Sequence, residues 1–215
     1  MKISKRLNVI ADLIEDNSKV IDCGCDHGLL SIYLALEKNC NVLATDINEN
    51  ALDNAINNIR KYKVDNVTTK LTDGIDNIDV INYDVLVIAG MGTMTIKHIL
   101  EDKELCDNII ISSNNQIPEL RQFMFSIGYH IDNELFITDK GKKYIIIKYV
   151  KGKKKYSKID IEYGPIIKDD INYLIYELEK LFEIREKVKY SKFLVRYKVE
   201  RKIKRLNKLI NKRSQ

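Results

Sequence analysis

Short apolar runs alternate with amphipathic segments along the first 150 residues, which predicts alternating strands and helices. The runs are bounded by polar or turn residues and are almost wholly apolar, as is typical of buried strands in a parallel sheet. The predicted strands are Lys19–Cys23, Asn41–Thr45, Val67–Leu71, Tyr83–Ala89 and Asn108–Ile111. The predicted helices cover residues 3–15, about 28–37, 48–62, 92–100 and 118–127. We interpret this part of the chain as an opening helix followed by five strand–helix repeats.

A different pattern follows the last of these helices. Tyr129–Thr138 and Lys143–Val150 are two strand-like runs, and Asp139-Lys140-Gly141 between them is a hairpin signal. A plain dinucleotide-binding domain would continue to alternate strand and helix. The sequence therefore predicts a seven-stranded, doubly wound α/β sheet closed by a terminal β-hairpin, which is the architecture of Rossmann-like class I methyltransferases.

The remainder of the chain changes character again. Lys151–Lys158 reads as a linker rich in glycine and lysine, and Tyr163-Gly164-Pro165 as a turn. From Lys168 onwards apolar residues recur three or four apart. We predict two long helices that break within 188–194 and form an antiparallel hairpin, with one continuous helix as the alternative. The expected domains are residues 1–155 and 156–215.

The charge is distributed unevenly over these two parts. Residues 1–150 hold 16 Lys and Arg against 22 Asp and Glu, whereas residues 151–215 hold 20 against 9. Residues 191–215 alone hold ten basic residues and one acid, Glu200. Such a segment favours a polyanionic partner, although a solvated helix face is the simpler alternative.

Composition bears on where in the cell the protein acts and on whether its cysteines bind a metal. The chain has no apolar run of about 18 residues and its N-terminus lacks the apolar core of a signal peptide, so we expect a cytoplasmic protein without a membrane span. Cys23 and Cys25 form a C-x-C pair, but no second pair with ligand spacing follows. We expect small core or turn residues there, no disulfide framework and no metal.

The first predicted strand runs into the turn Asp22-Cys23-Gly24-Cys25-Asp26-His27-Gly28. Glycines allow close approach of the backbone, and the helix that follows offers free N–H groups to a nucleotide-like cofactor. The turn differs from the Gly-x-Gly-x-x-Gly fingerprint of dinucleotide sites. A carboxylate at Asp26 repels a pyrophosphate and suits the positively charged S-adenosylmethionine (SAM), which favours SAM over NAD. The expected cofactor contacts from this turn are Asp22, Gly24, Cys25, His27 and Gly28.

Further cofactor contacts are expected after the next two strands. Asp46 is placed to bind the ribose hydroxyls, with a helix N-cap as the alternative role. Ile47 would pack on the adenine ring. Asp73 and Gly74 are placed for the adenine amino group, unless they form only a turn.

The substrate side is expected after strands four and five. Ala89-Gly90-Met91-Gly92 follows strand four, and two glycines around one large apolar residue suit the close approach of a flat ring to a methyl group. Ala89 would contact the cofactor, Gly92 the substrate, and Gly90 and Met91 the reacting groups. The simpler alternative is a strand-to-helix turn. Asn114 follows strand five and would hydrogen-bond a base, or else cap a loop.

The sequence leaves more than one role for each of two side chains near the turn, His27 and Tyr33. His27 would act as a general base, orient the site or cap the helix. Tyr33 would stack on a base or fill the core, and its helical position favours the core.

The chain resembles the bacterial TrmK family, the tRNA (adenine-N1)-methyltransferases that modify adenine 22. The resemblance spans the whole chain and rests on matching stretches at Ser4-Lys5-Arg6-Leu7, Asp22–Gly28 through Ile32-Tyr33-Leu34, Ile88–Gly92 and Tyr163-Gly164-Pro165. Two positions depart from the family: Thr93 stands where members often have a second glycine, and Ser112-Ser113-Asn114 stands where they have Gln-Pro-Asn.

The resemblance implies SAM-dependent methylation of N1 of adenine 22 in tRNA. N1 of neutral adenine carries a lone pair, so alignment rather than a strong base is needed, and the base must leave its stack. Asp26 or Asn114 would stabilise the cationic product. The resemblance implies a role for Arg6 near the target nucleotide or the tRNA backbone, with a surface salt bridge as the simpler alternative. The helical segment would hold the tRNA backbone through Arg196, Lys198, Arg201, Lys202, Lys204 and Arg205.

Several alternatives remain at this point: an NAD(P)-linked oxidoreductase, a non-catalytic RNA-binding protein, and a methyltransferase acting on another RNA site or a small molecule. We expect a monomer, because no apolar surface stripe is evident outside the helical hairpin.

Overall fold

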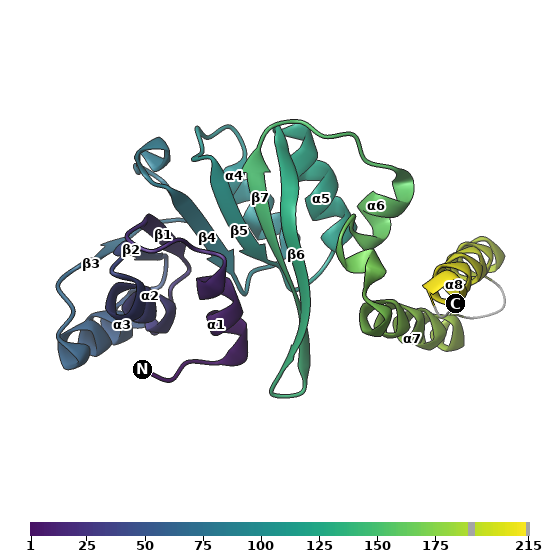
Figure 1. Cartoon of the computed structure of the whole chain (residues 1–215), viewed down its shortest axis with the longest axis horizontal. Helices are drawn as coiled ribbons and strands as arrows, with labels where there is room; N and C mark the ends of the chain where they lie inside the picture. Colours follow the sequence, from purple (N-terminus) through teal and green to yellow (C-terminus); the bar gives the residue numbers. More distant parts are fainter. Residues whose placement is uncertain (189–191, 214–215) are drawn as a thin grey trace. The chain divides into compact units, whose positions relative to one another are not determined.

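A seven-stranded sheet forms the centre of residues 1–155, the first of two units in the computed structural model, which describes residues 1–188 and 192–213 (Figure 1). The strand order is β3-β2-β1-β4-β5-β7-β6, and all pairs are parallel except those made by β7. The strands are β1 (Lys19–Cys23), β2 (Asn41–Asp46), β3 (Val67–Leu71), β4 (Val85–Ala89), β5 (Asn108–Ser112), β6 (Tyr129–Asp139) and β7 (Lys142–Lys151). The predicted architecture is confirmed.

Helices cover both faces of this sheet (Figure 1). One face carries α1, α2 and α3, whose apolar residues form a continuous core with strand residues such as Val20, Val87 and Ile110. The other face carries α4 and α5, which bury Ile96 and Leu120. The helices are α1 (Lys5–Asp12), α2 (Leu29–Lys38), α3 (Glu49–Tyr62), α4 (Thr93–Leu100) and α5 (Ile117–Ser126).

The order of pairing places the site. β1 pairs with β2 on one side and with β4 on the other, so the chain leaves β1 and β4 towards opposite faces. In open parallel sheets, ligands bind outside the carboxyl ends of the strands at such a switch point. The carboxyl ends of β1, β2 and β4 are where the sequence places its glycine and acidic residues.

The predicted repeats need one correction. β3 and β4 are joined by residues 72–84, which contain the short 3₁₀ helix η1 (Val80–Asn82) and no α-helix. Four α-helices therefore follow strands of the parallel sheet, in agreement with the predicted helix ranges, and the description as five strand–helix repeats is wrong for the third repeat, which has no α-helix. β4 also begins at Val85 and not at Tyr83, because Asp84 closes the strand end: its carboxylate accepts from the Lys19 amide at 2.7 Å and its own amide donates to the Lys19 carbonyl.

The opening helix is shorter than predicted, since it spans Lys5–Asp12 within the expected 3–15. The Ser4 hydroxyl accepts from the Leu7 amide and so fixes the first turn. At the other end of the unit, Lys140 and Gly141 adopt φ of +49° and +79°, the conformation of a tight β6–β7 turn. The hairpin signal in the sequence is therefore confirmed.

Residues 156–215 form the second unit, which starts with a helix that the sequence pattern missed. The α6 helix (Lys158–Tyr163) lies in the segment expected to be linker and turn, and a capping box between Ser157 and Asp160 starts it. It ends at the predicted turn, where Gly164 has φ of +83°. The short 3₁₀ helix η2 (Ile167–Asp169) follows.

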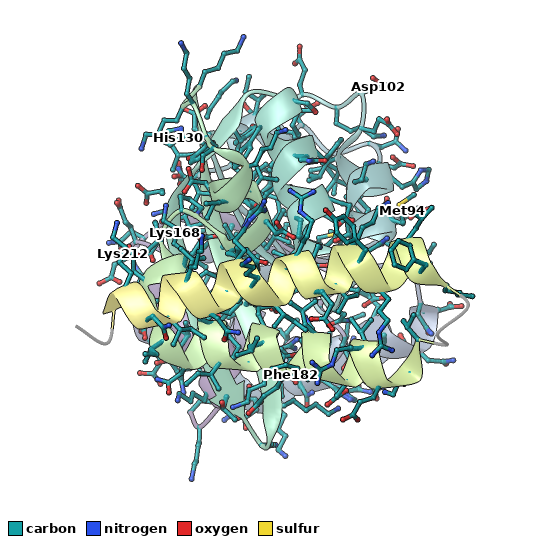
Figure 2. The ribbon with its side chains drawn as sticks, turned by 90° about the vertical axis from the view of Figure 1, so that its right-hand side faces the viewer. Met94, Asp102, His130, Lys168, Phe182 and Lys212 are labelled. Atoms are coloured by element: carbon teal, nitrogen blue, oxygen red, sulfur yellow. The ribbon has the colours of Figure 1, made fainter. Side chains whose placement is uncertain are left out.

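Two long helices complete this unit (Figure 2): α7 (Ile171–Lys187) and α8 (Phe193–Arg213). α7 begins three residues later than predicted, because the Asp170 carboxylate caps it by accepting from the Asn172 and Tyr173 amides. The alternative of one continuous helix is wrong, since Val188 is extended and ends α7. The expected break overlaps residues 189–191, which lie outside the described residues. Among the described residues, no helix has the length and apolar character to cross a membrane.

A fully buried ion pair joins α5 to the terminal hairpin. The Arg121 Nε donates to the Glu134 carboxylate at 2.8 Å, and both side chains are wholly inaccessible to solvent. Burying one charge without the other is costly, whereas a well-packed apolar pair of similar volume is tolerated. The pair therefore fixes how β6 lies against α5 and contributes little net stability.

We expect Glu134→Leu to lower the free energy of unfolding by about 3–5 kcal/mol, because it leaves the buried Arg121 guanidinium without the carboxylate that neutralises it. The double variant Arg121→Met/Glu134→Leu should recover most of that loss. Urea unfolding of the two variants beside wild type measures both effects. A double variant as unstable as the single one would contradict this account.

Candidate active site

Five loops meet at the carboxyl edge of the parallel strands. They comprise the segments after β1, β2, β3, β4 and β5, namely residues 24–28, 47–48, 72–74, 90–92 and 113–116. The loop residues expected to bind cofactor or substrate are therefore brought to one edge of the sheet. A cavity of about 580 Å³ lies elsewhere, lined by the amino ends of β1 and β2 together with residues 77–83, and plays no part in this site.

Asp22 is the buried acid of the site. Its side chain lies in β1 with 4% of the residue exposed, and its Oδ2 accepts a hydrogen bond from the Ser31 hydroxyl at 2.6 Å. Burial raises the pKa of Asp22 to about 6, against the opposing effect of the Ser31 hydrogen bond. The group therefore titrates close to neutrality, in contrast to an ordinary surface aspartate.

The turn after β1 is held from β2. The amides of Gly24 and Cys25 both donate to the Thr45 carbonyl, at 2.8 and 2.9 Å, and Gly24 adopts φ of +78°. Gly28 has φ of +66° and caps α2, and an added Cβ there would lie 3.0 Å from the Cβ of Ala55. Gly28 thus serves close packing of α2 on α3.

His27 does not cap α2, because Gly28 occupies the N-cap position. The His27 side chain is more than half exposed, and its Nε2 lies 3.7 Å from the Asp26 carboxylate. Its carbonyl accepts from the Asn58 side chain at 2.9 Å, which anchors the turn to α3. The structure thus gives His27 an anchoring role through its backbone.

Met91 lies directly over Gly24. A Cβ added at Gly24 would come within 2.3 Å of the Met91 Cε, so the flexible Met91 side chain would have to move, and the φ of +78° at Gly24 also favours glycine. The glycine motif after β1 and the Gly-Met-Gly motif after β4 are thereby in contact, although they are 67 residues apart. The turn expected to bind the cofactor and the turn expected to face the substrate are therefore in contact.

Asp46 is oriented by backbone amides. One carboxylate oxygen accepts from the Asp26 amide at 3.1 Å and the other from the Asn48 amide at 2.9 Å. Asn48, and not Asp46, caps α3, so the alternative cap role for Asp46 is wrong. Ile47 is 67% exposed beside it, an apolar surface next to a carboxylate.

Asp73 and Gly74 do form a turn, in which the Asp73 carbonyl accepts from the Asp76 amide. Gly74 has φ of +57°, and a Cβ there would lie 2.7 Å from Ile99 of α4. Packing against α4 therefore explains Gly74, while the Asp73 side chain is exposed at the site edge.

The loops after β4 and β5 are tied together. The Asn114 Nδ2 donates to the Gly90 carbonyl at 2.6 Å, and the Asn114 amide donates to the Met91 carbonyl at 2.9 Å. These bonds leave the Asn114 side-chain oxygen as the group able to accept from a ligand. Gly92 caps α4 and lies beside Asn115, whose side-chain oxygen accepts from the Thr93 amide at 3.0 Å.

The two positions that depart from the family pattern contact each other. The hydroxyls of Thr93 and Ser113 lie 3.0 Å apart in a buried position, and the Thr93 hydroxyl donates to the Asn115 carbonyl at 2.7 Å. The Ser112 carbonyl accepts from the Gly90 amide. Both replacements thus belong to one hydrogen-bond network that holds the substrate-side loops.

Arg6 reaches this edge from α1. Its guanidinium lies 5.0 Å over the ring of Tyr144, and a Cβ added at Gly90 would be 3.6 Å from its Nη1. Its amide donates to the Asp139 carboxylate, which lowers the pKa of Asp139. Arg6 therefore lies beside the turn after β4, and its role near the target nucleotide stays a prediction.

The remaining expected residues have structural explanations. Tyr33 and Ala89 are partly buried against the core, and Cys25 belongs to it. Burial raises the pKa of the Cys23 thiol to about 12, which makes it inert as a nucleophile. Among the described residues no group of three or more His, Cys, Asp or Glu side chains could hold a metal ion.

The basic residues of α8 divide into two sets. Lys202 and Arg205 both bind Glu162 of α6, at 2.7 and 2.9 Å, so they hold this unit together. Lys198, Lys204 and Lys208 are exposed and form no ion pair with a described residue. Arg196 is partly buried, and the Arg201 guanidinium lies 5.9 Å over the ring of Tyr197.

Sequence reasoning missed three contributors. Ser31 is a lone hydroxyl on the apolar side of α2, Tyr144 is an aromatic residue in a β7 run of isoleucines, and Thr93 was noted only as a departure from the family. The pairing of Ser31 with Asp22 had a local signal, since the first turns of α2 follow β1 directly. The contacts of Tyr144 and Thr93 join segments that are distant in sequence and had no such signal.

Comparison with known proteins agrees with this geometry. A family model described as a methyltransferase domain matches residues 3–147. The MG248 protein of Mycoplasma genitalium, provisionally named a tRNA methyltransferase, is 32% identical over 72% of each chain. The tRNA (adenine(22)-N(1))-methyltransferase of Bacillus subtilis is 28% identical over 68% of this chain and 64% of its own.

Structural similarity extends further along the chain. The structure of M. capricolum TrmK in complex with S-adenosylhomocysteine covers 98% of this chain and 99% of its own, at 29% identity and a TM-score of 0.86. The match thus includes both the sheet and the C-terminal helices. The chain belongs to the methyltransferase-domain family and, within it, to the group of TrmK methyltransferases.

Proposed function

We propose that this protein transfers a methyl group from SAM to N1 of adenine 22 in tRNA. The observation that carries the proposal is the near-complete coverage by TrmK, which contains S-adenosylhomocysteine, together with its 29% identity. The Bacillus subtilis relative supplies the nucleotide and the atom. This proposal accounts for the acidic site and the basic helical unit together.

The residues at the sheet edge fit SAM. Asp22 offers a buried carboxylate to the ammonium group of the methionine part, and Asp46 offers two oriented oxygens to the ribose hydroxyls. Ile47 offers an exposed apolar face for the adenine ring, with the Asp73 carboxylate near its amino group. A phosphate would meet acidic groups here, which disfavours NAD.

When bound, SAM would supply a methyl group on a positively charged sulfur, which leaves as a neutral thioether when a nucleophile with a lone pair attacks in line with the methyl–sulfur bond. The chain's part is positioning. Gly90 and Gly92 keep the turn around Met91 narrow, so that a flat base can approach. The Asn114 oxygen is available to accept a hydrogen bond from the adenine 6-amino group, which gains acidity as N1 becomes methylated.

Two charged groups complete the substrate side. Arg6, held over Tyr144, is placed to bind a phosphate beside the target nucleotide. Asp26 is exposed, and its carboxylate would stabilise the positive charge of the methylated base. No strong general base is required, because N1 of neutral adenine already carries a lone pair.

In this proposal residues 1–155 bind SAM, and residues 156–215 bind the tRNA backbone through the exposed basic side chains of α8. The enzyme would act in the cytoplasm, where tRNA is modified. A monomeric state stays a prediction.

Labelled methyl transfer from SAM to unmodified tRNA, followed by nucleoside analysis, tests the proposal. We expect N1-methyladenosine with wild-type tRNA and none when guanine replaces adenine 22. Methylation that persists after the replacement would assign another site. No incorporation by a protein that binds SAM would overturn the tRNA substrate.

We expect SAM affinity to depend on pH through Asp22. The ionised form binds the ammonium group, and a pKa of about 6 makes the affinity at pH 5 about 10-fold weaker than its plateau above pH 7. Ser31→Ala removes a hydrogen bond that favours the ionised form, so the midpoint should move to higher pH. Titration calorimetry between pH 5 and 8 measures both.

Asp22→Asn is the control, and its weak binding should not vary with pH across this range. The stability of the unliganded protein should change in the opposite sense. A raised pKa in the folded state means that the contribution of Asp22 is fully present below pH 4 and is lost as the pH rises through 6. An identical midpoint in wild type and Ser31→Ala would contradict the assignment.

Lys204→Gln and Lys208→Gln should each weaken tRNA binding and reduce the slope of log Kd against log salt by about 1, because each removes one phosphate contact. Lys202→Gln should leave that slope nearly unchanged, since Lys202 is occupied by Glu162. Lys61→Gln, at an exposed position in α3, is the matched control for loss of one charge. Equal slopes for all four variants would contradict the division of α8 into two sets.

A further inference from the structure

The start of α8 exposes an unusual concentration of apolar side chains. Phe193 is 72% exposed, Leu194 73%, Val195 44% and Tyr197 53%. Burial in this unit cannot explain them, because the buried side of α8 is formed by other residues. Exposed apolar clusters on a protein surface commonly mark a binding site.

The exposed and buried sides of α8 are opposite each other. Val199, Ile203 and Leu206 are buried and recur at three- and four-residue steps. At 100° per residue, Phe193, Tyr197 and Arg201 lie on the other side of the helix axis. Their side chains therefore form an exposed row.

Within this row the flat groups are stacked. The rings of Phe193 and Tyr197 have centroids 6.5 Å apart and planes inclined by 18°. The guanidinium of Arg201 lies 5.9 Å over the ring of Tyr197. The three side chains, which we call the α8 stack, thus present π surfaces at successive turns of one helix.

Positive charge continues along the same side. Lys204 and Lys208 follow Arg201 at steps of three and four residues, and both are exposed. Neither makes an ion pair with a residue that the structure describes. An apolar protein surface would leave these lysines unmatched, whereas a nucleic acid matches both the flat groups and the positive charge.

We propose that the α8 stack is a platform on which an unpaired base of an RNA stacks, while Lys204 and Lys208 bind the adjoining phosphates. Proteins that bind single-stranded nucleic acid combine aromatic faces with a basic track in this way. The proposal deepens the proposed function, and it rests on that function only for the identity of the RNA as tRNA. It assigns α8 a contact with bases as well as with phosphates.

The test compares substitutions that keep apolar area but remove π surface. Phe193→Leu/Tyr197→Leu retains exposed apolar side chains and helix propensity, but removes both rings, the Tyr197 hydroxyl and the ring under Arg201. We expect the full-length double variant to bind unmodified tRNA at least 10-fold more weakly, with an unchanged salt slope, because base stacking involves no counterion release. Tyr197→Trp should bind as tightly as wild type or more tightly.

Leu194→Ala is the matched control, since it removes an exposed apolar side chain that is not in the stack. It should leave the affinity for tRNA unchanged. SAM affinity and helix content by circular dichroism should match wild type in every variant. Loss of tRNA affinity in Leu194→Ala equal to that in the double variant would overturn stacking in favour of a general apolar contact.

A second measurement separates this proposal from the choice of substrate. Wild type should bind a 12-nucleotide oligoadenylate more tightly than an abasic ribose–phosphate oligomer of equal length. The double leucine variant should bind the two oligomers equally. This outcome needs no methyl transfer, so it holds even if tRNA is not methylated. Equal binding of both oligomers by wild type would overturn the platform.

Analytical sedimentation of the same proteins tests whether a second copy of the chain, and not an RNA, binds the α8 stack. Wild type should sediment as the same species as the double leucine variant at all concentrations. A concentration-dependent oligomer of wild type that the variant does not form, with RNA affinity unchanged, would assign the α8 stack to a second copy of the chain and overturn the proposal.

Discussion

The site depends on one carbonyl oxygen. Thr45 of β2 accepts from the amides of both Gly24 and Cys25, and these two bonds turn the chain sharply as it leaves β1. The turn brings the Asp26 amide to the Asp46 carboxylate and exposes Gly24 to Met91. Three loops from different strands are thus fixed relative to one another by backbone geometry, before any side chain contributes specificity.

The acids of the site differ because their surroundings differ. Asp22 is buried and accepts hydrogen bonds from Ser31, and burial outweighs these bonds and raises its pKa to about 6. Asp26 and Asp73 are exposed, and water stabilises their charge. A positively charged cofactor would stabilise ionised Asp22 most, since burial keeps water away from that carboxylate. The acid whose ionisation a bound cation would change most is therefore also the most buried one, Asp22.

The second unit uses positive charge in two ways. Lys202 and Arg205 neutralise the partly buried Glu162 and so stabilise the packing of α8 on α6. Neighbouring residues on other sides of α8, such as Lys204, are exposed and available to a polyanion. A count of basic residues does not distinguish these roles, since neighbouring positions on one helix face different surroundings. Any binding experiment on this unit must treat them separately.

The sequence by itself determined the order of the main strands and helices along the chain, the terminal hairpin and the edge of the sheet where the site lies, because these follow from local periodicity and turn chemistry. It missed α6, whose six residues give too short a pattern, and the role of Gly28, which reflects Ala55 on another helix. Only the tertiary structure decided that Met91 meets Gly24, that Arg6 lies over Tyr144, and which lysines of α8 are already paired. Those contacts join residues far apart in the chain, and their geometry depends on how the sheet and helices pack.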